Sequence, residues 1–181
     1  LAIKSKSKRI LVSSNRLLDS WSPYDTLPDN INFAKDHCSP YLLSDGVTLY
    51  FAAQDQDGIG GLDIYVSRYN TATESYTTPE NIGLPYNSPA NEYMFVVDEV
   101  RQIGFLATDR FARKGHVHVY SFAIPEQKQY WRDIASESLV AYARLEHFEK
   151  YTEELIEVHH KIENIDETDD FSFIIIRTWR N

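Results

Sequence analysis

A glycine-rich segment between residues 54 and 63 holds the densest set of side chains that could do chemistry. Three carboxylates and three glycines lie together there, in the order Asp55, Asp57, Gly58, Gly60, Gly61 and Asp63. Carboxylates beside glycine turns are what a loop needs to bind a hard cation such as Ca²⁺. However, the third oxygen ligand and the terminal glutamate of an EF-hand loop are missing. We therefore favour a turn between strands, with Asp63 pairing with nearby backbone, and keep Ca²⁺ at Asp55, Asp57 and Asp63 as a weaker hypothesis.

Two histidines and one cysteine offer other chemistry. His116 and His118 alternate, which places both imidazoles on one face of a strand, where they could bind a transition metal. No third ligand lies nearby in the sequence, so we favour polar residues on a sheet surface. Cys38 is the single cysteine, which excludes an internal disulfide, and its apolar surroundings favour a small core residue.

Catalysis by the chain itself is not expected. A Ser-His-Asp hydrolase is the obvious enzyme hypothesis, but the sequence contains no Gly-x-Ser-x-Gly segment. We therefore assign no catalytic residue, no cofactor and no firm metal site. The net charge of −9 argues against nucleic acid, which needs a basic footprint. No apolar run approaches the ~18 residues that cross a bilayer, so no transmembrane segment is predicted.

The elements that hold these residues belong to a repeat of about 54 residues. Residues 50–55 align with 104–109, Asn32 with Asn87, and Leu27-Pro28 with Leu84-Pro85. A partial copy lies upstream, where residues 10–14 match 64–68. Aromatic residues that recur at the repeat period are expected to pack one module against the next, and they are Trp21, Tyr76 and Trp131. The chain thus contains the end of one module, a complete second and most of a third.

Each complete module is predicted to form four strands. In the second module they span 38–43, 47–53, 62–68 and 73–79, and Asp45-Gly46 provides a hairpin turn between the first two. Four strands at this period match one blade of a β-propeller. The remainder differs: apolar residues at steps of three and four predict a helix over 136–162, followed by a strand over 171–179. We therefore divide the chain into blades at 1–130 and a helical extension with a terminal strand at 131–181.

The second module resembles the WD40-like repeat of TolB-type and tricorn-type β-propellers, especially the version common in cell-envelope proteins of Bacteroidetes. The resemblance lies in Pro40, Leu42 or Leu43, Ser44-Asp45-Gly46, Leu49-Tyr50-Phe51-Ala52, the glycine-rich turn and Asp63-Ile64-Tyr65. The linker pattern Asn-x-x-x-(Asp/Asn) is also family-like, at 32–36 and 87–91. The third module departs from the pattern, because Glu99-Val100 replaces Asp-Gly and His118 replaces the aspartate.

The resemblance implies a mainly β chain with about two to three four-stranded antiparallel blades. Closed propellers use about four to eight blades. We therefore expect a partial propeller, completed by blades from the same polypeptide or another copy. The family also implies a periplasmic or outer-membrane-associated location.

The expected function is a non-catalytic binding or scaffold module that presents inter-blade loops to a protein or glycan. The alternative is an accessory propeller of a peptidase or glycan-active enzyme whose catalytic domain is elsewhere. The contact loops are expected at 54–61 and 108–115. Their candidate residues are Asp55, Asp57, Gly58, Gly60, Gly61, Asp109 and Arg110.

Overall fold

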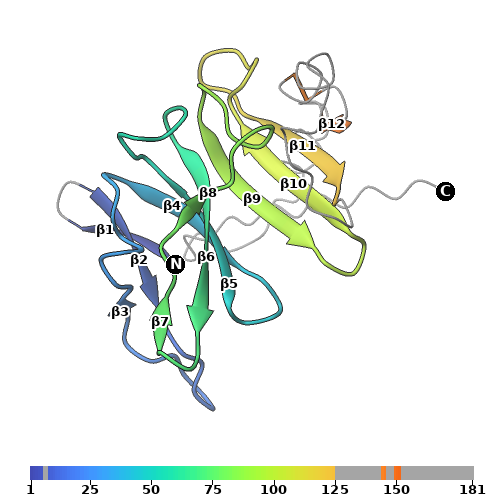
Figure 1. Cartoon of the computed structure of the whole chain (residues 1–181). Helices are drawn as coiled ribbons and strands as arrows, with labels where there is room; N and C mark the ends of the chain where they lie inside the picture. Colours follow the sequence, from blue (N-terminus) through green and yellow to red (C-terminus); the bar gives the residue numbers. More distant parts are fainter. Residues whose placement is uncertain (6–7, 125–143, 146–148, 152–181) are drawn as a thin grey trace, which may run out of the picture.

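The computed structural model describes residues 1–5, 8–124, 144–145 and 149–151, and within them the fold is all-β. Three antiparallel sheets lie side by side in chain order, with the second between the other two (Figure 1). The mainly β prediction is therefore confirmed. The predicted strand 171–179 lies outside the described residues, as does most of the predicted helix 136–162.

The middle sheet is the complete module. Its five strands are β4 (His37–Leu42), β5 (Thr48–Ala53), β6 (Asp63–Asn70), β7 (Ser75–Tyr76) and β8 (Glu80–Asn81). The first four match the predicted strands and pair in chain order, while β8 pairs with β6. The β4–β5 turn forms as predicted, because Gly46 has a φ of 70° and Asp45 accepts the backbone N–H groups of Val47 and Thr48.

The flanking sheets repeat parts of this arrangement. The first sheet contains β1 (Ala2–Ser5), β2 (Lys8–Ser13) and β3 (Asp25–Thr26). The third contains β9 (Glu92–Asp98), β10 (Ile103–Thr108), β11 (His118–Ala123) and β12 (Glu149–Tyr151). The short strands β3, β8 and β12 are equivalent, because each pairs with the corresponding residue of the preceding long strand, namely Val12, Tyr65 and Tyr120.

β12 corrects part of the helix prediction. Its three residues fall inside the predicted helix, yet Glu149–Tyr151 pairs with β11 through Ser121, Tyr120 and Val119. The edge of β11 offers backbone hydrogen bonds there, and tertiary pairing overrides a local helical pattern. At these three residues the helix prediction is wrong, and it is also wrong at Arg144 and Leu145, which form a turn in which Leu145 has a φ of 59°.

The pairing registers also correct the alignment of the repeat by one residue. His37 pairs with Ala53 in the middle sheet, and Glu92 pairs with Thr108 in the third. The spacing between equivalent residues is therefore 55 in β5, as it already is between Asn32 and Asn87, rather than the 54 predicted by aligning residues 50–55 with 104–109. As a result Gln54, and not Asp55, is the counterpart of Asp109.

Asparagine side chains join consecutive sheets at equivalent places. Asn32 Oδ1 accepts the N–H of Leu11 at 2.7 Å, and its Nδ2 donates to the carbonyl of the same residue at 3.0 Å. Asn87 does the same to Ile64, at 2.8 Å in both directions. Each asparagine precedes a sheet and completes hydrogen bonds of the sheet before it. These contacts give the family-like linker pattern a physical role.

The fourth residue after each asparagine adds a second contact to the same strand. Asp36 Oδ1 accepts the N–H of Arg9 at 2.9 Å, and Asn91 Oδ1 accepts the N–H of Leu62 at 3.0 Å. We call the set of Asn32, Asp36 and the strand β2 the first junction. The set of Asn87, Asn91 and the start of β6 is the second junction.

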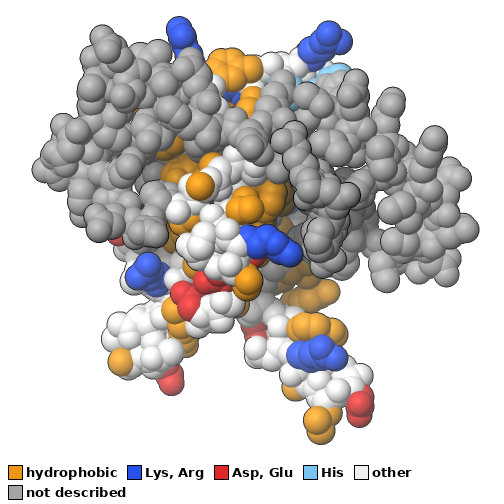
Figure 2. Space-filling view, turned by 90° about the vertical axis from the view of Figure 1, so that its right-hand side faces the viewer, with side chains coloured by type: hydrophobic (Ala, Val, Ile, Leu, Met, Phe, Trp, Pro, Cys, Tyr) orange, Lys and Arg blue, Asp and Glu red, His pale blue; other side chains and the backbone are white. Residues whose placement is uncertain are grey.

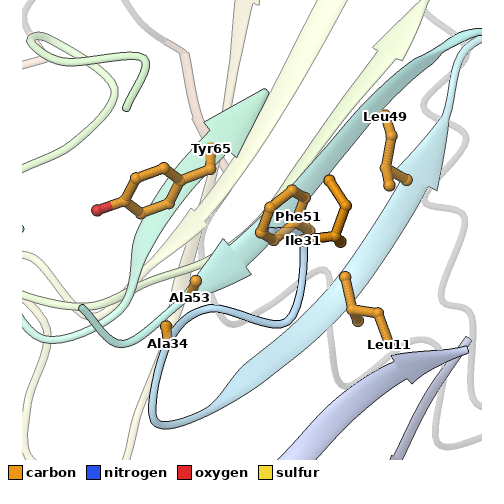
Figure 3. Packing of buried hydrophobic residues seen from close by; sticks show 7 residues of the cluster. All are labelled: Leu11, Ile31, Ala34, Leu49, Phe51, Ala53 and Tyr65. Atoms are coloured by element: carbon orange, nitrogen blue, oxygen red, sulfur yellow. The ribbon is translucent and has the colours of Figure 1, made fainter. Parts of the chain in front are cut away.

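One hydrophobic cluster lies at each junction. The first cluster joins Leu11 of β2 to Phe51 and Tyr65 of the middle sheet, with Ile31 from the linker between them (Figure 3). The second cluster joins the other face of the middle sheet to the third sheet, and consists of Cys38, Ala52, Leu62, Ile64, Phe95, Leu106 and Phe122. Both faces of the middle sheet are therefore buried, as in a stack of modules.

Candidate functional site

The glycine-rich loop 54–62 is held by Asp63 from within. The Asp63 side chain is buried, and its Oδ2 accepts the backbone N–H groups of Ile59 and Gly60 and the Nδ2 of Asn81 at 3.1 Å. This arrangement matches the preferred interpretation, in which Asp63 pairs with nearby backbone. Its main role is to fix the shape of the loop.

The three glycines of the loop allow close approach of other groups. A Cβ on Gly58 would lie 2.5 Å from Asp63 Oδ2, which is closer than van der Waals contact permits. A Cβ on Gly60 or Gly61 would overlap the linker before the third sheet, at Ser88, Ala90 and Asn91. The glycines at 58, 60 and 61 are thus required by packing at the second junction.

The carboxylates proposed for Ca²⁺ do not form a ligand set. Asp55 Oδ2 accepts the Tyr65 hydroxyl at 3.2 Å, Asp57 is exposed, and Asp63 is engaged as described, although its Oδ1 is buried without a hydrogen-bond partner in the described part of the chain. Burial raises the pKa of Tyr65 to about 12, so its hydroxyl stays protonated beside these carboxylates. Among the described residues no group of three histidine, cysteine or acidic side chains could hold a metal ion.

Asp109 and Arg110 hydrogen-bond to the linker before the third sheet and to the first residues of β9. Asp109 accepts hydrogen bonds from the Asn91 backbone and side chain, each at 2.8 Å, and from the Tyr93 hydroxyl at 3.0 Å. Burial opposes ionisation of Asp109, but these hydrogen bonds outweigh it and lower its pKa. The carboxylate therefore acts as a fixed acceptor at the start of β9.

Arg110 is buried in an ion pair with Glu92. Its guanidinium donates to Glu92 Oε1 at 3.0 Å and to the carbonyls of Pro85 and Tyr86 at 2.9 Å. Glu92 also accepts the Ser88 hydroxyl at 2.6 Å and the Thr108 hydroxyl at 3.0 Å. Burial raises the pKa of Glu92, against the hydrogen bonds from Ser88 and Arg110. This network fixes the linker at the second junction, and it leaves Arg110 little surface to offer a partner.

The exposed side chains of the two loops differ from the predicted candidates. Phe111 is 67% exposed and has a φ of 61°, a conformation that is rare for a bulky residue. Arg113, Lys114 and His116 are also exposed on this loop, whereas loop 54–62 exposes Gln56, Asp57 and Ile59. Figure 2 shows Lys or Arg, His and hydrophobic side chains gathered at the upper end of the molecule, where the β10–β11 loop lies. The two equivalent loops therefore present opposite charge.

Sequence reasoning missed Phe111 because nothing in the pattern shows which side chains point outward. A signal was present, since Phe111 lies just before the cationic residues Arg113 and Lys114. The structure also separates the two histidines that were considered as metal ligands. His118 is buried at the start of β11, and His116 is exposed in the loop before it. Their side chains are thus not a matched pair on one strand face.

The last residues singled out in the sequence are Cys38 and the aromatic residues that recur at the repeat period. Cys38 is buried and its thiol approaches the Tyr93 carbonyl at 3.8 Å, while burial raises the thiol pKa. Tyr76 packs on the first cluster and against Tyr69, as expected for an inter-module contact. Its counterpart Trp21 is 65% exposed, and Trp131 lies outside the described residues.

Comparison of the chain with protein-family models, curated proteins and solved structures found no match in any of the three. Helices long and apolar enough to cross a membrane are absent from the part of the chain that the structure describes.

Proposed function

We propose that the chain is a non-catalytic binding or scaffold module built from propeller-type blades. The support comes from repetition: three antiparallel sheets share equivalent short strands, and equivalent asparagines join them. In such a stack each module buries its faces against its neighbours, so the variable loops are the surfaces free to evolve contacts. By the resemblance, the module belongs to a bacterial cell-envelope protein, in the periplasm or at the outer membrane.

The single observation that carries the binding surface is the exposed Phe111 in a left-handed conformation. The positive backbone φ of Phe111 and the exposure of its ring to solvent both cost stability, and backbone outliers of this kind concentrate at functional sites. Arg113 and Lys114 follow it, on a chain of net charge −9. The partner is therefore a protein or glycan that presents an anionic group beside an apolar surface. A flat sugar face with a carboxylate satisfies both requirements.

The test is binding of the purified chain to a glycan array that includes uronic-acid polysaccharides, repeated with two variants. The variant Phe111→Ser with Lys114→Gln removes the aromatic ring and one charge, and is expected to lose most of the bound signal. The control Thr73→Ala changes an exposed residue of the β6–β7 hairpin and is expected to bind like the wild type. Binding that survives the loop variant would contradict the proposed surface. Hydrolysis of a bound glycan by the pure chain would contradict the non-catalytic function.

A further inference from the structure

His37 lies at the first junction with no exposed surface. Its Nε2 accepts the N–H of Ala34 at 3.3 Å, and its Nδ1 lies 3.3 Å from the carbonyl of Arg9 in β2. An imidazole nitrogen that accepts a hydrogen bond carries no proton, so the proton is on Nδ1 and donates to Arg9. The neutral ring therefore links the first sheet to the linker of the middle sheet.

The charged groups around His37 come from two elements. Lys8 and Arg9 lie on β2, and Asp36 precedes His37 in the linker. Burial is the largest effect on the pKa of His37 and lowers it, and Lys8 also lowers it. The backbone carbonyls of Arg9 and Ile31 and the charge of Asp36 act in the opposite direction. The rings that lie against His37 are those of Phe51 on β5 and Phe33 in the linker, and neither titrates. Cys38 follows on β4 with a raised thiol pKa, outside the range in which a histidine titrates.

A proton on Nε2 would remove the acceptor for Ala34 and place a cation in a fully buried site. The second junction has Glu92 at the equivalent position, paired with Arg110. Arg110 and the hydroxyls of Ser88 and Thr108 hold the Glu92 carboxylate there, and the segments that form the second junction, 62–68 and 87–92, contain no histidine that mild acid would charge. The two junctions therefore respond differently to acid.

We propose that the first junction is a proton-controlled contact, in which protonation of His37 releases β1–β3 from the middle sheet while the second junction stays closed. The linkage has a definite sign. The folded junction disfavours the charged imidazole, so its contribution is complete above the unfolded pKa of about 6.5 and is lost as the pH falls below it. Opening exposes the first hydrophobic cluster, including Leu11 and Ile31. This inference is independent of the proposed glycan or protein partner.

The test is hydrogen–deuterium exchange of the full chain at pH 7.5 and 5.5, corrected for the intrinsic pH dependence of exchange. Peptides covering 8–13 and 31–36 are expected to exchange up to about tenfold faster at pH 5.5, because that pH lies about one unit below the unfolded histidine pKa of about 6.5. Peptides covering 62–68 and 87–98 are expected to change little. Equal acceleration at both junctions, or none at the first, would overturn the proposal.

Two variants separate His37 from other acid-sensitive groups. His37→Gln keeps a donor and an acceptor but cannot titrate, so its exchange at the first junction is expected to be the same at both pH values. His118→Gln removes the buried histidine of the third sheet and should keep the wild-type response. If His37→Gln does not fold, nuclear magnetic resonance titration of the wild-type His37 ring decides the matter. Acid loosening while that ring stays neutral would refute the mechanism.

Discussion

The two junctions share one backbone plan but differ in their buried polar groups. Asn32 and Asn87 make equivalent hydrogen bonds to the preceding sheet. At the next equivalent positions of the repeat, Asp36 at the first junction corresponds to Asn91 at the second, and His37 corresponds to Glu92. The first junction places its ion pair, Arg9–Asp36, at the surface, and the second buries Arg110–Glu92. The two junctions therefore share the same asparagine-to-backbone hydrogen bonds but differ in which charged side chains they contain and in whether the ion pair is buried.

The largest expected effect is the loss of Glu92. Glu92→Ala leaves the Arg110 guanidinium buried without its counter-ion, which is expected to cost about 3–5 kcal/mol in urea unfolding. The equivalent change His37→Ala should cost less, because it leaves no buried ion behind. A larger loss for His37→Ala than for Glu92→Ala would break the comparison. Glu92→Gln, which keeps an acceptor, is expected to fall between the wild type and Glu92→Ala.

Asn32 and Asn87 should contribute about equally to the free energy of unfolding. Asn87→Ala leaves the buried N–H of Ile64 without its side-chain acceptor and is expected to cost about 2–3 kcal/mol, with a similar loss for Asn32→Ala. Urea unfolding of both variants measures the two losses. Thr73→Ala, which changes an exposed residue of the β6–β7 hairpin, serves as the control. A loss below about 0.5 kcal/mol at either site would show that the asparagine is dispensable there.

A smaller effect concerns how each sheet fills the same space. Leu49 pairs with Ser67 in the middle sheet, whereas the counterpart of Leu49 in the third sheet, Gly104, pairs with Phe122. A Cβ on Gly104 would overlap the Phe122 ring, so Gly104→Ala is expected to cost about 1–3 kcal/mol by overpacking. The double change Gly104→Leu with Phe122→Ser recreates the middle-sheet pair. It should recover at least about 0.5 kcal/mol relative to the sum of the two single changes. Additive losses in a double-mutant cycle would show that the side chains at 104 and 122 do not compensate for one another in filling the same space.

The smallest effect belongs to the exposed ion pair. Asp36→Asn copies Asn91, keeps an acceptor for the Arg9 N–H, and removes the charge together with the Oδ2 acceptor of the Arg9 guanidinium. Arg9 lowers the pKa of Asp36, so the contribution of the ion pair is present at neutral pH and is lost as the pH falls through that lowered value. The pair is partly exposed, so the expected loss at pH 7 is below about 1 kcal/mol and shrinks further in 1 M salt. Unfolding at two salt concentrations checks this, and a salt-independent loss would point to altered geometry.

The sequence predicted the parts of the fold that depend on local patterns. The strands of the middle sheet, the turn at Gly46 and the core position of Cys38 follow from alternation, turn residues and burial. The partners of Asn32 and Asn87 could not be predicted, because each lies more than 20 residues away in the chain. The strand β12 was missed because its pairing depends on the edge of β11. The inward direction of Arg110 depends on Glu92, which no local pattern connects to it.

The asparagine contacts have a consequence for the order in which the protein is made. The hydrogen bonds of Leu11 are completed by Asn32, 21 residues later, and those of Ile64 by Asn87, 23 residues later. A growing chain therefore cannot finish one sheet until the linker of the following sheet has left the ribosome. Cutting the chain between sheets would leave the earlier sheet with exposed strand N–H groups. A sheet is thus complete only together with the asparagine of the following linker, Asn32 for β2 and Asn87 for β6. This structural unit extends beyond the end of the module that the sequence repeat defines.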